Sequence, residues 1–204
     1  MLDFLVLSQQ CAPVVDVRTM AALVRVESGF NPYAIGVVHG RLERQPRNLP
    51  EAVATAKYLE SNGYNYSVGL SQVNRYNFAR YGLTLETAFE PCANLGAGSK
   101  ILTGCFTSAR GRFGTDQNAL RAALSCYYSG NYTTGFNQGY VQRVVANATD
   151  SGVKPIPVVP AIDRSATTDR PKAAGNARAK PDATPRDDSA VDPDKRDPQD
   201  AVVF

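Results

Sequence analysis

Residues 13–32 read PVVDVRTMAALVRVESGFNP, and this stretch predicts an amphipathic helix over residues 13–28. Pro13 suits the first turn of a helix, where its missing amide hydrogen is not needed. Side chains three and four positions apart share one helix face, and here that face carries Met20, Leu23, Val24 and Glu27. Gly29 is a common residue just past a helix end, and Pro32 prevents continuation. One acidic side chain therefore lies on an otherwise apolar face.

Glu27 differs from the other glutamates in this respect. The chain holds six of them, at Glu27, Glu43, Glu51, Glu60, Glu86 and Glu90. Burial on the apolar face disfavours the charged carboxylate and raises its pKa, and the negative end of the helix dipole acts in the same direction. A carboxyl group that stays protonated near neutral pH is suited to protonate a leaving oxygen. The pattern alone leaves a second interpretation open, in which Glu27 reaches solvent past Gly29.

The composition of the 204 residues excludes several classes of protein. No apolar run approaches the roughly 20 residues that cross a bilayer, so we expect no membrane span. A formal net charge of +3 is too small to favour nucleic acid as a partner. The chain divides into a domain over residues 1–150 and a tail over residues 151–204, which holds eight of the 13 prolines. The tail's composition predicts disorder, and the tail serves either as a passive linker or as a docking segment.

The domain is predicted to be mainly α, with one small irregular or β segment. Further helices are expected over residues 49–61, 75–80, 91–109, 117–128 and 137–148. Asn48 with Glu51 resembles a capping pair, and Asn74 and Asp116 are expected to cap the helices that follow them. Residues 64–74, YNYSVGLSQVN, predict an extended or hairpin segment because they are rich in Tyr, Ser and Gly.

All four cysteines precede the tail, at Cys11, Cys92, Cys105 and Cys126. They form no CxxC pair, and His39 is the only histidine, so the sequence predicts no metal site. His39 itself is expected at the surface. An even number of cysteines favours two disulfides formed in an oxidising compartment, with buried free thiols as the alternative. Four cysteines allow three pairings, so the connectivity stays open.

The first ten residues, MLDFLVLSQQ, do not match a secretory signal. They contain Asp3, lack Lys and Arg, and have too short an apolar run. We expect export to use either a signal removed from this numbering or another route.

Four short motifs follow one another in the chain. They are ESGFNP at residues 27–32, GLSQVN at residues 69–74, CANL at residues 92–95 with Gly98 and Ile101-Leu102 after it, and CYYSG at residues 126–130. Together and in this order they resemble the signature of the lytic transglycosylases related to goose-type lysozyme. The runs QQCAP, NPYAIGVV and SVGLSQVNRYN resemble more narrowly the transglycosylase component of bacterial type IV secretion systems. The resemblance covers about residues 8–145 and does not extend into the tail.

The resemblance implies an α+β lysozyme-like catalytic domain in the periplasm that acts on peptidoglycan glycan strands without a cofactor. Glu27 would be the only acid and base. It would protonate the oxygen between N-acetylmuramic acid and N-acetylglucosamine and then accept the proton of the muramic C6 hydroxyl, which leaves a 1,6-anhydro end. No second catalytic carboxylate is required, whereas ordinary glycosidases use two. Other secretion components would be partners of the tail.

The resemblance also implies roles for residues around Glu27, each with a plainer alternative. Gln72 would bind the N-acetyl group or support Glu27, or else satisfy backbone groups in a turn. Tyr127 would bring its hydroxyl to Glu27 and the sugar, or else be a core ring. Asn94 would tie its helix to the groove, or else be purely structural. Ser28 would end its helix and orient Glu27.

This chain departs from the family pattern at three positions. Ser71 stands where Met is frequent, Tyr128 stands where Asn is usual, and Gly36 stands where many relatives carry a Ser that contacts the acid. Another donor, either water or Tyr127, is therefore expected to hold the carboxyl group. Aromatic side chains suit a sugar groove, although half or more are expected to be ordinary packing: Tyr58, Tyr64, Tyr66, Tyr76, Tyr81, Tyr127, Tyr128, Tyr132 and Tyr140.

Residues 37–66 form a longer segment than in the simplest relatives and are expected to make one wall of the groove. The cations of this segment either meet acidic peptide stems or form a solvated basic face: Arg41, Arg44, Arg47 and Lys57. Two other functions remain open at this level. One is a hydrolytic lysozyme of the same fold, and the other is a peptidoglycan-binding scaffold that has lost activity.

Overall fold

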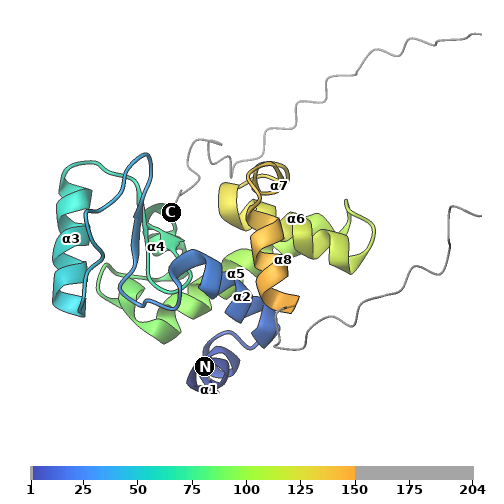
Figure 1. The fold of residues 1–204 in the computed structure, drawn as a ribbon, viewed down its shortest axis with the longest axis horizontal. Coiled ribbons are helices and arrows are strands. Elements are labelled where there is room, and N and C mark those ends of the chain that lie inside the picture. The colour runs from blue at the N-terminus through green and yellow to red at the C-terminus, as the bar shows by residue number, and fades with distance from the viewer. Residues whose placement is uncertain (1, 150–204) are drawn as a thin grey trace, which may run out of the picture. The chain divides into compact units, whose positions relative to one another are not determined.

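The computed structural model describes residues 2–149, which form the mainly helical domain that the sequence predicts (Figure 1). Its elements are α1 (Leu2–Cys11), α2 (Val17–Ser28), β1 (Ile35–Val37), α3 (Leu49–Ser61), β2 (Tyr66–Val68), β3 (Val73–Asn74), η1 (Arg75–Asn77), α4 (Phe78–Tyr81), η2 (Thr87–Phe89), α5 (Pro91–Arg110), α6 (Asp116–Ser129), α7 (Thr134–Asn137) and α8 (Tyr140–Thr149). None of the helices in this part of the chain is both long and apolar enough to cross a membrane. The disorder predicted for residues 151–204 lies outside the described residues.

Helix α2 begins at Val17 rather than at the predicted Pro13. Asp16 is its N-cap, because the Asp16 carboxylate accepts hydrogen bonds from the backbone N–H groups two and three positions later, at 2.9 and 3.2 Å. Such a cap satisfies donors that the start of a helix leaves unpaired. Gly29 ends the helix in the left-handed conformation at φ 58°, as expected. The predicted buried face is confirmed, and Glu27 is part of it.

The sheet has three antiparallel strands in the order β1-β2-β3. Strand β1 pairs with β2 in the register Ile35–Val68, Gly36–Ser67 and Val37–Tyr66. Strands β2 and β3 form the hairpin predicted for residues 64–74, and a tight turn over residues 69–72 joins them. Strand β1 was not expected, because three residues are too few to show an alternating pattern.

The other helices follow the predicted ranges with four differences. The N-cap of α6 is Thr115, whose side chain accepts a hydrogen bond from Asn118 N at 3.2 Å, and not Asp116. The predicted final helix, residues 137–148, is α8, which begins only at Tyr140, directly after Gly139 at φ 71°, and the short α7 lies before it. The predicted helix over residues 75–80 is the 3₁₀ turn η1 followed by α4, and α1 has no counterpart among the predicted helices.

Two large apolar clusters fill most of the domain, and a small third one lies between α5 and α6 around Ala109 and Ala122. The larger of the two joins α2, α5, α6 and α8 through side chains such as Leu23, Leu102 and Val144. The other large cluster lies between the sheet and α3 and includes Val68 and Ala56. In Figure 1 the sheet and α3 occupy one end of the domain, α6, α7 and α8 occupy the other, and α2 and α5 run between them. The carboxyl end of α2 therefore lies where the two groups of elements meet.

Both disulfides expected from the cysteine count are present. Cys11–Cys92 joins α1 to α5, and Cys105–Cys126 joins α5 to α6. Of the three pairings that the sequence left open, the fold selects this one. The two bonds span 81 and 21 residues. Closing loops of this size removes conformations from the unfolded chain, which stabilises the fold by about 3–4 kcal/mol for each bond in the chain-entropy picture.

Candidate active site

The Glu27 carboxyl group lies in the last turn of α2 and is almost completely buried, with an exposed fraction of 6%. It is the only buried carboxyl group between residues 4 and 149. Burial raises the pKa of Glu27 from 4.5 to about 7, although a hydrogen bond from Tyr140 and the positive charge of Arg143 act in the opposite direction. The carboxyl group therefore holds its proton at pH values where an ordinary glutamate has lost it.

Tyr140 is the hydrogen-bond donor to this carboxyl group. Its side chain is buried at the start of α8, and its hydroxyl donates to Glu27 Oε1. Burial and the neighbouring carboxylate raise the pKa of Tyr140 well above its usual value, so its hydroxyl remains a donor. Sequence reasoning expected water or Tyr127 in this role and placed Tyr140 only among the candidate sugar-binding rings. The contact depends on the packing of α2 against α8, which no local pattern reveals.

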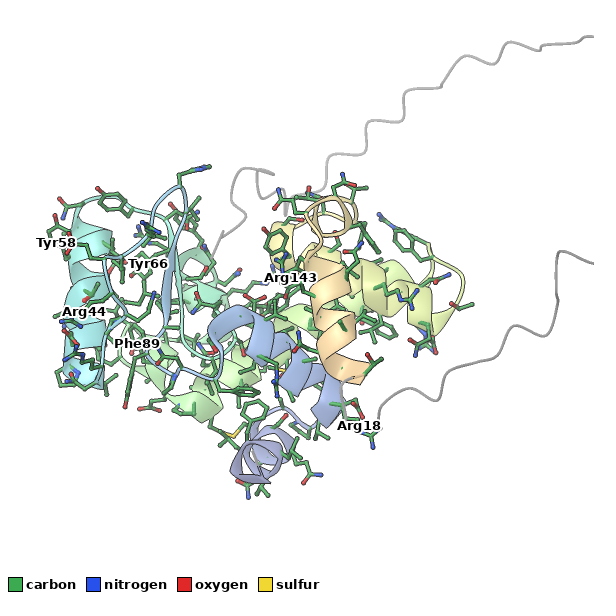
Figure 2. The ribbon with its side chains drawn as sticks, in the orientation of Figure 1. Arg18, Arg44, Tyr58, Tyr66, Phe89 and Arg143 are labelled. Carbon is green, nitrogen blue, oxygen red and sulfur yellow. A yellow bond between two sulfur atoms is a disulfide. The ribbon has the colours of Figure 1, made fainter. Side chains whose placement is uncertain are left out.

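A second tyrosine holds the ring of Tyr140. Tyr128 stacks on it with 4.5 Å between the ring centres and 17° between the ring planes. The Tyr128 hydroxyl donates to Gln138 Oε1 at 2.6 Å. Arg143 Nη1 donates to the Gln138 carbonyl at 3.2 Å, and its guanidinium carbon is 6.0 Å from the centre of the Tyr140 ring. Figure 2 shows Arg143 on the α8 side of the domain, away from the sheet.

The side chain of Asn94 holds the turn between β2 and β3 in place through hydrogen bonds. Asn94 Oδ1 accepts from the Ser71 N–H at 2.7 Å, while its Nδ2 donates to the carbonyls of Val68 at 2.9 Å and Ala88 at 2.7 Å. The approach is so close that a Cβ at Gly69 would lie 2.3 Å from Asn94 Nδ2. Asn94 and Ser71 are both fully buried and shape this turn. Their expected place among the substrate-binding residues stays a prediction.

Gln72 ends this turn in a left-handed conformation, φ 46°, which is uncommon for a residue other than glycine. Its Nε2 donates to the carbonyls of Ala34 at 3.1 Å and Gly69 at 2.9 Å. The alternative in which Gln72 satisfies backbone groups is therefore correct for its amide nitrogen. Its Oε1 is buried and has no hydrogen-bond partner among the described residues. An acceptor in that state is available to an N–H group that enters from outside.

Tyr127 is buried, and its hydroxyl donates to the backbone carbonyl of Ser71. The contact links α6 to the same turn. Gly98 of α5 makes room for it, because a Cβ there would lie 2.5 Å from Ser71 Cβ and 3.2 Å from the Tyr127 oxygen. Tyr127 therefore acts on the turn that carries Gln72.

Ser28 connects the end of α2, which carries Glu27, to the β2–β3 turn, which carries Gln72. Its hydroxyl donates to the Leu70 carbonyl at 2.8 Å and lies 3.2 Å from the Val24 carbonyl within its own helix. The residue that follows Glu27 is thereby attached to the turn that carries Gln72. This agrees with the expectation that Ser28 orients the end of α2.

Tyr66 was expected among the candidate substrate-binding residues, and the structure places its side chain in the core. Its side chain is 0% exposed and packs in the cluster between the sheet and α3. Burial raises the pKa of Tyr66 to about 12. Figure 2 shows Tyr66 and Phe89 together on the sheet side of the domain. Its aromatic character therefore reflects core packing.

A cavity of about 570 Å³ lies beside β1 and is lined by Ile35, Gly36, Val37, His39, Gly40, Arg41, Leu42 and Gln45. His39 is exposed, as predicted, and adopts φ 58°. Of the four cations predicted in residues 37–66, two have acidic partners: Arg44 is paired with Glu51, and Lys57 Nζ is 3.2 Å from Glu86 Oε1. Within residues 2–149 no group of three or more His, Cys, Asp or Glu side chains is placed to hold a metal ion.

Comparison with known proteins gives one family. The model of the "Transglycosylase SLT domain" matches residues 4–148. A "Type IV secretion system protein virB1" of Brucella suis biovar 1 is 58% identical over 171 residues, which is 81% of this chain and 71% of that protein. A "Protein virB1" of Agrobacterium fabrum is 34% identical over 161 residues, which is 77% of this chain and 63% of that protein. No solved structure matches.

Proposed function

This chain belongs to the transglycosylase SLT domain family, and on that premise we propose that it is a peptidoglycan lytic transglycosylase with Glu27 as its single acid and base. The bond cleaved is the one between N-acetylmuramic acid and N-acetylglucosamine, and the product carries a 1,6-anhydro end. The observation that carries the proposal is the Glu27 carboxyl group, which is buried beside the Tyr140 hydroxyl and has its pKa raised to about 7.

The first step needs a protonated acid. Glu27 gives its proton to the bridging oxygen, and the bond between that oxygen and the anomeric carbon of the muramic sugar breaks. The Glu27 carboxylate formed in this step accepts a hydrogen bond from Tyr140, and the charge of Arg143 stabilises it further. These two contacts favour the state that follows proton transfer, while burial favours the state before it. Because these effects oppose each other, the pKa of Glu27 is raised to about 7 and the group can both give and accept a proton near neutral pH.

The second step returns the proton. The Glu27 carboxylate takes the proton of the muramic C6 hydroxyl while the C6 oxygen bonds to the anomeric carbon. One bond has been broken and one formed within the sugar strand, Glu27 has recovered its starting state, and no water has been consumed. A route that uses the substrate's own hydroxyl does not require a second catalytic carboxylate, and between residues 4 and 149 no other carboxyl group is buried.

Gln72 is suited to bind the sugar's N-acetyl group. Its buried Oε1 lacks a partner among the described residues, while two backbone carbonyls fix its amide nitrogen. An N–H donor from the substrate would satisfy this oxygen, and the held nitrogen keeps the acceptor in place before the substrate arrives. The fixed geometry reduces the entropy lost on binding.

The cellular setting of the proposal follows from the relatives. The Brucella protein is named as a type IV secretion system protein, and we extend that setting to this chain: local opening of the cell wall for such a system. The two disulfides fit an oxidising compartment such as the periplasm. We assign contact with other secretion components to residues 151–204, on their composition alone.

Mass analysis of digested cell-wall sacculi tests the proposal. We expect the full chain to release anhydro-muropeptides, and we expect Glu27→Gln to reduce the release by about 10²–10⁴-fold, the usual contribution of a general acid and base. Products one water heavier, with a reducing end, would instead show a hydrolytic lysozyme. Equal release by the wild type and Glu27→Gln would exclude Glu27 as the acid, and sacculus binding without any release by the wild type would indicate a scaffold.

A further inference from the structure

We propose that the cavity beside β1 binds the acidic peptide that branches from the muramic sugar, with Arg41 as the residue that binds its carboxylate. The inference rests on the proposed function, because it names the part of that substrate which this cavity receives. It does not concern the Glu27 chemistry, and the two are tested separately below.

The cavity is preformed. Its volume of about 570 Å³ lies in the range that bound small molecules occupy. The Gln45 side chain is fastened to the outer edge of β1 by two bonds, since its Oε1 accepts from Ile35 N at 2.8 Å and its Nε2 donates to Ile35 O at 3.0 Å. At the other end, the Gly40 N–H donates to the Val37 carbonyl at 3.2 Å and closes the turn that holds His39. The segment that walls the cavity is thus attached to the strand at both ends.

The charge of the cavity is positive and uncompensated. Its lining contains Arg41 and His39 but no Asp or Glu. Two of the other cations of this segment are paired, Arg44 with Glu51 and Lys57 with Glu86. Arg41 forms no ion pair in the part of the chain that the structure describes, and Glu43, two positions along the chain, is exposed and does not line the cavity. A guanidinium that lines a cavity without acidic residues is suited to receive a carboxylate from a ligand.

The position of the cavity connects it to the candidate active site. Ala34, which immediately precedes β1, accepts hydrogen bonds from Gln72 Nε2 at 3.1 Å and from the Gly69 N–H at 2.9 Å. β1, which lines the cavity, therefore begins directly after the residue that accepts the Gln72 hydrogen bond. In the proposed complex the branch of a glycan strand bound at Gln72 follows β1 toward Arg41.

The occupant follows from the chemistry. The peptide on the muramic sugar is short and carries several carboxylates between small apolar side chains. The cavity offers Arg41 to a carboxylate and the apolar surface of Val37 and Leu42 to the small side chains. Where the peptide is attached, the lactyl carboxyl group of the muramic sugar is an uncharged amide, so the carboxylates that reach Arg41 are those of the peptide.

Binding to the full chain carrying Glu27→Gln tests the inference without turnover. The probes are the muramic acid–glucosamine disaccharide with its peptide and the same disaccharide with its lactyl carboxyl group capped as a methylamide, titrated by calorimetry. We expect the peptide to tighten binding about tenfold, the usual order for one charge-assisted contact, and less at high salt. Arg41→Gln added to Glu27→Gln should remove most of this gain. Arg110→Gln is the matched control, because Arg110 is exposed, lies on α5 and is paired with Asp116.

The outcomes separate the two proposals. Equal binding of both disaccharides, or a gain that survives Arg41→Gln, would overturn the inference and leave the proposed function standing. Binding of neither disaccharide would overturn the inference, whereas the proposed function is tested by the sacculus digestion. With Glu27 intact, Arg41→Gln should raise KM for peptide-bearing glycan and leave cleavage of amidase-treated, peptide-free glycan unchanged. An equal loss on both substrates would also overturn the inference, because it would indicate a general structural effect.

Discussion

At the scale of single residues, the site depends on two opposing effects on one carboxyl group. Burial raises the pKa of Glu27, and the Tyr140 hydroxyl and the Arg143 charge lower it. The apolar face of residues 13–28 was enough to single out Glu27 from the sequence, because its neighbours on the helix are local. Tyr140 was not singled out, because it lies 113 residues away and meets Glu27 only through the packing of α8 on α2.

Tyr140→Phe removes the donor and keeps the ring. Since the Tyr140 hydrogen bond lowers the pKa of Glu27, its loss should raise that pKa above about 7. The alkaline limb of the kcat/KM profile should then move to higher pH, while the maximal rate falls because the carboxylate formed in the reaction has lost a partner. Tyr132→Phe, at a ring that packs on Phe113, is the control. An unchanged alkaline limb in Tyr140→Phe would show that the hydroxyl does not act on Glu27.

Glu27→Gln should also stabilise the fold at alkaline pH. The folded pKa of about 7 lies above the unfolded value of 4.5, so the folded state binds more protons in this window and stability falls as pH rises from about 4.5 to 7. Glutamine has no charge to bury and can still accept from Tyr140. Relative to wild type, the variant should gain about 2–3 kcal/mol between pH 5 and pH 8, as measured by urea unfolding. A pH-independent difference would mean that Glu27 is ionised in the same way in both states.

At the scale of elements, the ring of Tyr128 on α6 holds the first residue of α8. Tyr128→Leu removes the stacked ring and should lower kcat and shift the alkaline limb in the direction of Tyr140→Phe. Tyr128→Phe keeps the ring and loses only the bond to Gln138, so it should recover most of the wild-type profile. A Tyr128→Leu profile that matches wild type would assign the ring to packing alone.

Two glycines of α5, Gly98 and Gly104, allow a test with a matched control. Gly98→Ala would bring a Cβ to 2.5 Å from Ser71, so the turn that carries Gln72 must move, and we expect a loss of about 1–3 kcal/mol together with most of the activity. Gly104→Ala on the same helix meets nothing within 4 Å and should stabilise it by about 0.5–1 kcal/mol with activity unchanged. Chemical unfolding and sacculus digestion measure both effects. Similar values for the two variants would contradict the close approach of α5 to the turn.

The long helices could be predicted from the sequence because their signals are local. Asn48 at the start of α3 and Gly29 at the end of α2 are where the sequence expects them. The errors arise where local signals compete or are too short. Thr115 caps α6 in place of Asp116, which becomes the first residue of the helix, and the last helix begins at Tyr140, directly after Gly139, rather than at Asn137.

At the scale of the whole molecule, the sequence predicted a mainly helical domain with a small sheet, two disulfides and Glu27 on a buried face. It did not predict which cysteines pair, nor that Tyr66, Ser71 and Asn94 are fully buried, because each of these depends on contacts between distant elements. The cavity at Arg41 has the same origin, since it exists only once residues 39–45 fold back over β1.

The central claim is that Glu27 keeps its proton near neutral pH, and its ionisation is directly measurable. The chain is labelled with ¹³C at the glutamate side-chain carboxyl carbons, and the spectrum of Glu27→Gln assigns the resonance that disappears. Titration of the folded protein should give a midpoint of about 7 for that resonance. A midpoint near 4.5, the value of an ordinary glutamate, would contradict the buried acid and with it the proposed reaction.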